Sequence, residues 1–179
     1  MKKRAALLIA FVMALSLTCV PGAQTAIALM MSGEMTPVTM LTPAASPLYP
    51  AGTKIIIKTD HMDGMQGAVG VVSGAYDTLL YAVDYVSETG EWVVNHRWVI
   101  AEEIMNMTGR ALAIGDVVTL GAGHMGGHGG TGKSATIVQI SRGPAYMIDY
   151  DPTDGGERVI NHQWVSEFEI EPFAEAKAN

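Results

Sequence analysis

The chain has 179 residues, with 18 acidic residues against 11 basic ones and a single cysteine, Cys19. The lone cysteine excludes an intramolecular disulfide. Three of the basic residues lie in the first four positions, and without them the chain has eight basic residues against 18 acidic ones, a net charge of −10. Nucleic acid and anionic lipid surfaces are therefore not expected as partners, because such a chain repels them.

The first 28 residues have the pattern of a secretory signal peptide. A positive stretch, Lys2 to Arg4, precedes an apolar run from Ala5 to Leu17 and a small-x-small cleavage site, Ala26 to Ala28. No later segment approaches the roughly 20 apolar residues of a membrane-spanning helix. We expect export to the cell envelope or the medium, with cleavage after Ala28. Lipidation of Cys19 is the alternative, although residues 16–18 match a lipobox poorly.

Residues 29–50 are predicted to form a flexible stalk. The segment is rich in Met, Pro and Thr, and prolines at 37, 43, 47 and 50 disfavour a regular helix or a paired strand. Its methionines either bind soft monovalent copper or are simply apolar residues.

From residue 51 onward the chain is a tandem repeat. The loop His61 to Gly67 returns in altered form at His124 to Gly130, 63 positions later. Two further landmarks follow each loop: Tyr-x-x-Asp-Tyr at 81–85 and 146–150, and Asn-His-x-Trp-Val at 95–99 and 161–165. The offset grows only to 65 and then to 66, as small loop insertions in a duplicated module would cause. We predict one repeat domain at 51–108, a second at 109–173, and a polar tail at 174–179.

Each repeat has the pattern of several short strands. In the first repeat we expect strands at 54–59, 68–73, 78–85 and 92–99, a turn at 74–77 and one helical turn at 101–104. In the second we expect strands at 116–120, 134–140, 145–150 and 158–165, before a closing segment at 166–173. Alternation over 81–85 predicts one buried face, formed by Tyr81, Val83 and Tyr85. The predicted fold class is all-β, with two tandem small SH3-like β-barrels after the signal peptide and the stalk.

These residues, in this order and spacing, resemble the YdhK family of exported bacterial proteins, which have two tandem copies of a domain of unknown function. The similarity covers about residues 48–171 and rests on His61 to Ala68, Tyr81 to Tyr85, Thr153 to Gly156 and both Asn-His-x-Trp-Val segments. The second repeat departs from the family pattern at His128 and Thr131. The resemblance implies an envelope location, often as a lipoprotein, and an occasional association with copper-handling neighbours. It implies no established activity.

Histidine and methionine side chains on the two glycine-rich loops are candidate metal ligands. The first loop offers one imidazole and two thioethers, which suit Cu(I). The second offers two imidazoles and one thioether, which are closer to the preference of Cu(II) or Zn(II). The alternative is that the methionines pack on the core while the histidines hold turns. The two candidate sets are His61, Met62 and Met65, and His124, Met125 and His128.

A second group of repeated residues surrounds each Asn-His-x-Trp-Val segment. We expect the tryptophans to fill the core and the histidines to hydrogen-bond a neighbouring strand through an aspartate. A second metal site or an exposed aromatic patch is the alternative. The residues are Asp84, His96 and Trp98 in the first repeat and Asp149, His162 and Trp164 in the second.

The chain lacks the sequence motifs of common enzymes, such as a Gly-x-Ser-x-Gly elbow or a His-Glu-x-x-His pair. Residues 127–134 match the letters of a phosphate-binding loop, but no helix is expected after them to supply its dipole and amides. We therefore predict a non-enzymatic protein that binds copper or a similar metal through its His/Met loops. The alternative is a module that binds a cell-wall peptide or an envelope protein through Tyr81, Tyr85, Trp92 and their counterparts. An exposed aromatic groove with dispersed histidines would favour this alternative.

Overall fold

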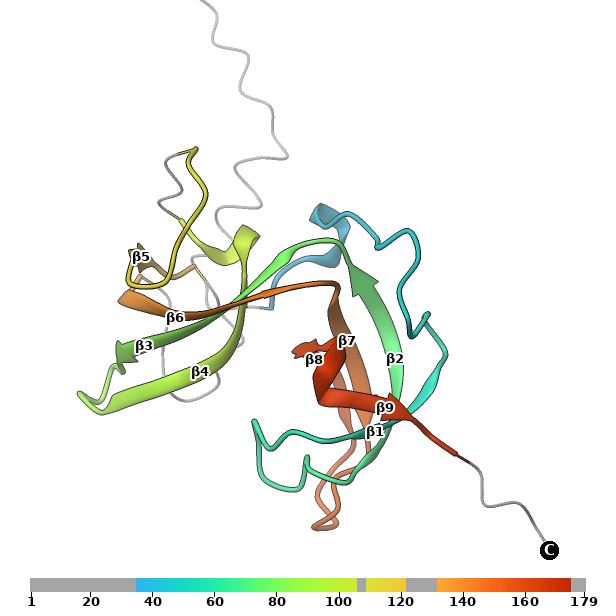
Figure 1. Cartoon of the computed structure of the whole chain (residues 1–179). Helices are drawn as coiled ribbons and strands as arrows, with labels where there is room; N and C mark the ends of the chain where they lie inside the picture. Colours follow the sequence, from blue (N-terminus) through green and yellow to red (C-terminus); the bar gives the residue numbers. More distant parts are fainter. Residues whose placement is uncertain (1–34, 106–108, 122–131, 175–179) are drawn as a thin grey trace, which may run out of the picture.

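The computed structural model describes residues 35–105, 109–121 and 132–174 (Figure 1). A 3-10 turn, η1 (Val38–Met40), lies ahead of the repeats. The first repeat forms β1 (Lys54–Ile57), β2 (Val69–Tyr76), β3 (Leu79–Val86), β4 (Trp92–Ile100) and η2 (Ala101–Glu103). The second forms β5 (Val117–Thr119), β6 (Ser134–Arg142), β7 (Ala145–Tyr150), β8 (Val159–Ser166), η3 (Glu167–Glu169) and β9 (Ile170–Pro172). The all-β prediction is confirmed, and the strands follow the predicted order.

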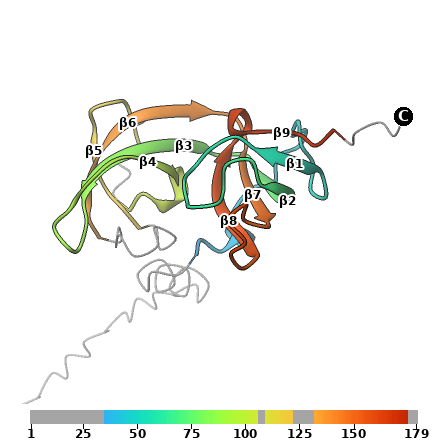
Figure 2. The same cartoon turned by 90° about the horizontal axis from the view of Figure 1, so that it is seen from below.

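The two repeats exchange strands between two antiparallel sheets. One sheet has the order β8-β7-β2-β1-β9 and the other has the order β4-β3-β6-β5. In the first sheet β2 pairs with β7 and β1 pairs with β9, while in the second β3 pairs with β6. We call these the β1 module and the β5 module. Figures 1 and 2 show how β2 leads into β3, and β6 into β7, as the chain passes from one module to the other.

The two modules have equivalent strand orders even though neither consists of one repeat. In the β1 module β9 pairs with β1. At the same place in the β5 module, Ile104 bridges Leu120 and the Met105 N–H donates to the Thr119 carbonyl at 2.9 Å. The prediction that 51–108 and 109–173 form separate barrels is therefore corrected. The predicted boundary near residue 109 divides the sequence repeats but not the structural modules.

The strand pairing also does not show the predicted closed SH3-like barrel. In the described ranges β8 and β9 lie at opposite edges of one sheet, and no ladder joins them. The other sheet is likewise open between β4 and β5. The coarser prediction, two small antiparallel β units built from a tandem repeat, holds.

The connection between β2 and β3 explains how the exchange starts. The turn predicted at 74–77 is absent, because Gly74 to Tyr76 continue β2. Neither Asp77 nor Thr78 has a positive φ, whereas the common two-residue hairpin turns require one. The chain therefore continues into the other sheet and does not fold β3 back onto β2.

A third hydrophobic cluster joins the cores of the two modules. Leu80 and Ala82 of β3 belong to this junction cluster, whereas Tyr81 and Val83 belong to the core of the β5 module. All four are at most 1% exposed. The prediction of one buried face on this strand is thus too simple, because β3 is covered on both sides where it passes the junction. The junction cluster comprises Leu41, Leu80, Ala82, Trp98, Ile100, Ala145, Met147 and Trp164.

Residues 35–50, predicted as part of a flexible stalk, pack on the folded modules. Thr36 and Leu41 are only 4% and 7% exposed. Pro43 bridges Tyr76, and the Ala44 N–H donates to the carbonyl of Ala75 at 2.9 Å. The prolines prevent a long regular element here, but apolar burial still holds the segment in place.

The signal peptide, Cys19 and residues 29–34 lie outside the described residues, as do positions 175–179 of the predicted tail. Among the described residues, no helix is long and apolar enough to span a membrane.

The exchange predicts that neither repeat folds by itself as a monomer. A fragment of residues 35–108 or of residues 109–179 lacks strands from both sheets. We expect each fragment alone to show poor NMR dispersion and no cooperative unfolding, and an equimolar mixture to regain the spectrum of the intact chain. A single fragment that is monomeric by sedimentation and natively dispersed would contradict the exchange.

Candidate functional site

The three metal-ligand candidates of the first loop lie in different environments. Met65 is 0% exposed in the core of the β1 module, whereas Met62 is 50% exposed. The His61 side chain is 10% exposed, and its Nε2 lies 2.9 Å from Glu169 Oε1. Gly64, with a φ of 71°, lies in the turn between the two methionines. The described arrangement therefore does not gather the three side chains at one surface.

The candidates of the second loop, His124, Met125 and His128, lie outside the described residues. In the part of the chain that the structure describes, no group of three or more His, Cys, Asp or Glu side chains is arranged to hold a metal ion. Copper binding stays a prediction. Directly after this loop, Ser134 begins strand β6, so the phosphate-loop spelling is followed by a strand and not by a helix.

Two buried glutamates, which the sequence analysis did not single out, tie the repeats together. Trp98 Nε1 donates to Glu169 Oε2 at 2.6 Å, and Trp164 Nε1 donates to Glu103 Oε1 at 3.0 Å. Each bond joins a tryptophan of one repeat to a glutamate of the other. A repeated spacing in the sequence could have identified them, because each glutamate follows the tryptophan of its own repeat by five positions.

Glu103, which is fully buried, is enclosed by the N-terminal segment. It accepts hydrogen bonds from the Ile100 N–H at 2.9 Å and from the Thr36 hydroxyl. The side-chain amide of Gln163 both donates to the Thr36 carbonyl, at 3.0 Å, and accepts from the Thr36 N–H, at 3.1 Å. Thr36, a residue before the first repeat, thus contributes to the surroundings of this carboxylate.

Glu169 is contacted by His61 of the first loop and by Ser166 of its own repeat. Its carboxylate accepts hydrogen bonds from the N–H and the hydroxyl of Ser166 at 2.8 and 2.9 Å, and it pairs with His61. Burial by itself raises the pKa of Glu169, but the hydrogen bond and charge of His61, with the bonds from Ser166 and Trp98, outweigh it and lower the pKa to about 2. Glu169 is therefore held as a carboxylate, and His61 acts as its partner.

The repeated aspartates and histidines make matching contacts in both modules. Asp84 Oδ1 accepts from the Asn95 N–H at 2.6 Å, where Asn95 has a φ of 52°. Asparagine tolerates this left-handed conformation better than most residues. The His96 ring packs edge-on against Tyr85, with ring centroids 5.9 Å apart. The second repeat has the same contacts among Asp149, Asn161, His162 and Tyr150. The aspartates thus hold a backbone kink in each outer strand.

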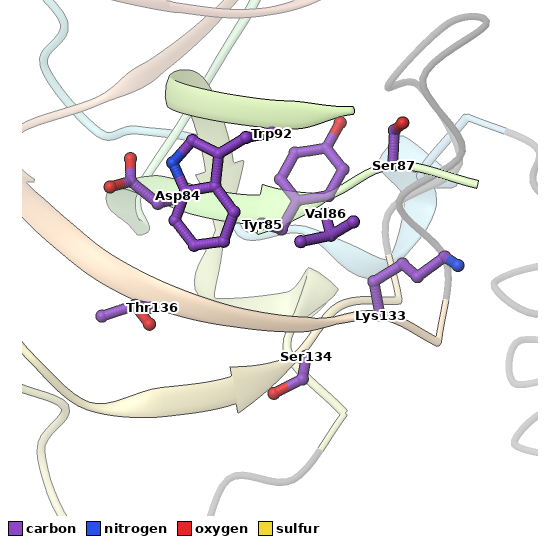
Figure 3. A pocket seen from close by; sticks show the side chains of 8 residues that line it. All are labelled: Asp84, Tyr85, Val86, Ser87, Trp92, Lys133, Ser134 and Thr136. Atoms are coloured by element: carbon purple, nitrogen blue, oxygen red, sulfur yellow. The ribbon is translucent and has the colours of Figure 1, made fainter. Parts of the chain in front are cut away.

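A groove on the sheet of the β5 module combines an exposed indole with polar side chains (Figure 3). Its volume is about 330 Å³. Trp92 is 64% exposed, whereas the other two tryptophans, Trp98 and Trp164, are 2% and 0% exposed. Tyr81 and Tyr85, also predicted for an aromatic surface, are each 1% exposed. The lining residues are Asp84, Tyr85, Val86, Ser87, Trp92, Lys133, Ser134 and Thr136.

Strand alternation and register assemble this groove. Asp84 and Val86 lie on the same face of β3 because side chains two positions apart point the same way. Val86 is opposite Trp92 of β4, and Asp84 is opposite Thr136 of β6. The groove therefore combines residues of both repeats, which explains why the sequence predicted Trp92 but not its neighbours on β6.

Residues 51–101 and 114–167 each match the sequence profile of a family described as a protein of unknown function, DUF1541. An uncharacterised Bacillus subtilis (strain 168) protein, YdhK, is 44% identical over 131 residues, which are 73% of this chain and 63% of that protein. The chain thus matches less than two thirds of the length of this relative.

Solved structures of the same relative share the fold. A crystal structure of the DUF1541 family protein YdhK from B. subtilis superposes with a TM-score of 0.73 at 41% identity, and covers 80% of this chain and 98% of that one. A solution NMR structure of the YdhK C-terminal domain gives a TM-score of 0.63 at 44% identity, and covers 68% of this chain and 92% of that one. The relatives therefore share the architecture, and their descriptions assign no activity.

The different environments of the two loop methionines give a direct prediction. Met65→Ala should lower the free energy of unfolding by about 2–5 kcal/mol because it leaves a cavity in the core. Met62→Ala should change it by no more than about 0.5 kcal/mol because the side chain is largely exposed. Urea denaturation of both variants checks this. Equal losses would place both methionines in one environment.

The lowered pKa of Glu169 predicts a stability difference that depends on pH. Because the pKa is about 2 in the folded protein, below the ordinary value, the ionised group stabilises the fold above its ordinary pKa. This contribution is lost as the pH falls from about 4.5 towards 2. The midpoint difference between the parent and Glu169→Gln should therefore shrink as the pH falls below about 4.5. A difference that is the same at pH 6 and pH 3 would contradict this role.

Proposed function

The chain belongs to the DUF1541 family, the family of YdhK, and on this premise we propose that it is a non-enzymatic binding protein of the cell envelope. Its Trp92 groove holds a wall or envelope component. Export rests on the signal-peptide pattern of residues 1–28, with a lipid anchor at Cys19 as the alternative to cleavage. The dispersal of His61, Met62 and Met65 favours the groove over a copper site in the first loop.

The exposure of Trp92 is the observation that carries this proposal. Tryptophan is a large side chain that usually buries most of its surface, and exposed examples are enriched where proteins bind partners. Here the indole borders a groove of about 330 Å³, within the range of about 300–1,000 Å³ that is typical of ligand sites. Polar groups line the same groove, and such groups fix the orientation of a bound ligand.

Comparison of the two modules supports a role outside folding. Trp92 corresponds to Arg158, because Val93 and Val159 take the same place opposite Tyr85 and Tyr150. Arg158 forms an exposed ion pair with Asp151 at 2.7 Å. The same fold position therefore accepts a charged residue, so the architecture does not require the indole.

Removal of the indole should abolish retention on the envelope. We expect Trp92→Ala to lower co-sedimentation of the mature protein with isolated, protein-free cell walls at least about tenfold, a loss of about 1.4 kcal/mol or more. Ile160→Ala is the matched control, because Ile160 is a 53% exposed apolar residue on β8 of the other module. Equal retention of both variants and the parent would refute the groove as the binding site.

A further inference from the structure

The geometry points to a glycan as the ligand: we propose that the Trp92 groove binds a chain of β-linked sugar rings. Trp92 stacks on a ring, and a row of hydroxyl and carboxylate side chains holds the sugar hydroxyls. The inference rests on the proposed function and narrows its ligand from a wall or envelope component to one chemical class.

Hydroxyl side chains form the part of the groove opposite the indole. Ser134 and Thr136 are two positions apart on β6 and share a face with Asp84 of β3. No other described residue makes a hydrogen bond with either hydroxyl. Figure 3 shows the indole lying between Asp84 and Val86, with Ser134 and Thr136 across the groove and Lys133 at the Ser87 end. The groove thus offers donors and acceptors along one side and an aromatic ring along the other.

The groove lies on the face of the sheet and not at its edge. Its floor is formed by β3 and β6. Strand β3 lies between β4 and β6, and strand β6 lies between β3 and β5, so both are paired on each side. Their backbone N–H and C=O groups are therefore used in the ladders. A peptide that binds by strand addition needs an unpaired edge, which this floor does not offer. Only side chains are available, and they suit a ligand that carries many hydroxyl groups.

Stacking on an indole suits a sugar ring in particular. The face of an aromatic ring is electron-rich, and a pyranose in an equatorial, β-linked chain presents weakly positive C–H groups on its faces and hydroxyls around its rim. One face can therefore lie on Trp92 while the rim hydroxyls reach Asp84 and Thr136. Asp84 Oδ1 already accepts the Asn95 N–H at 2.6 Å, which fixes the direction of the carboxylate.

The β1 module shows that folding does not require the hydroxyl row. Ala135 and Gly70 occupy equivalent places, opposite Tyr85 and Tyr150 respectively. By the same register, Ser134 and Thr136 correspond to valines, Val69 and Val71. Sheet positions like these commonly carry β-branched apolar residues. The serine and threonine therefore accompany the exposed tryptophan in one module only, as a ligand site would require.

The test uses the accessibility of Trp92 as its readout. Because the other two tryptophans are buried, acrylamide should quench mainly Trp92. The mature chain is titrated with a linear β-1,4-linked N-acetylglucosamine hexamer, and separately with a soluble stem peptide of the cell wall. We expect the oligosaccharide to protect the fluorescence from acrylamide and the peptide to leave it unchanged.

The variants separate recognition from folding. Ser134→Ala and Thr136→Val should each weaken oligosaccharide binding about 5–10-fold, the effect of one lost hydrogen bond. Trp92→Phe should retain part of the affinity and Trp92→Ala none, as calorimetry can measure. Ile160→Ala and Arg158→Ala, on the equivalent face of the β1 module, should bind as the parent does.

The possible outcomes separate failure of the glycan inference from failure of the proposed function. Protection by the stem peptide alone overturns the glycan inference and leaves the proposed function standing. If the hexamer does not bind but retention on cell walls still depends on Trp92, the glycan inference is likewise overturned and the proposed function stands. If retention on cell walls is the same for the parent and Trp92→Ala, both the inference and the proposed function are overturned.

Discussion

The structure depends on two indole–carboxylate hydrogen bonds that cross between the repeats. A buried carboxylate is costly unless donors surround it, and Glu103 and Glu169 each receive one of theirs from the tryptophan of the other repeat. The junction cluster around Trp98 and Trp164 removes water from these bonds, which strengthens them. Neither repeat can satisfy its own glutamate in this way. Strand exchange and carboxylate burial are therefore two consequences of one arrangement.

Within this shared frame the two modules differ in their exposed faces. The β1 module carries an ion pair between Asp151 and Arg158 where the β5 module carries Trp92. Among the described residues the partners of the glutamates differ as well, since His61 reaches Glu169 whereas Thr36 reaches Glu103. Duplication gives two copies of a stable fold, and positions that the fold does not constrain can then diverge. The groove lies at such positions.

Two residues of the first loop have structural roles, which its composition offered only as the alternative to metal binding. His61 bonds a buried carboxylate, and Met65 fills the core of the β1 module. Both are residues that a metal site would also use, which explains why the sequence favoured copper. The chemistry of a side chain limits what it can do, but the groups that the fold places beside it decide between a ligand and a packing residue.

The sequence by itself determined the repeat, the order of the strands and the presence of an export pattern. These features are local: alternation and recurring landmarks can be recognised without knowing which strand lies beside which. The tertiary structure alone decided that β2 pairs with β7 and β3 with β6, because both repeats carry the same strand pattern and either copy can supply a partner. It also decided that residues 35–50 pack on the fold and that Trp92, Ser134 and Thr136 line one groove. These arrangements join segments that are distant in the sequence, so no single segment encodes them.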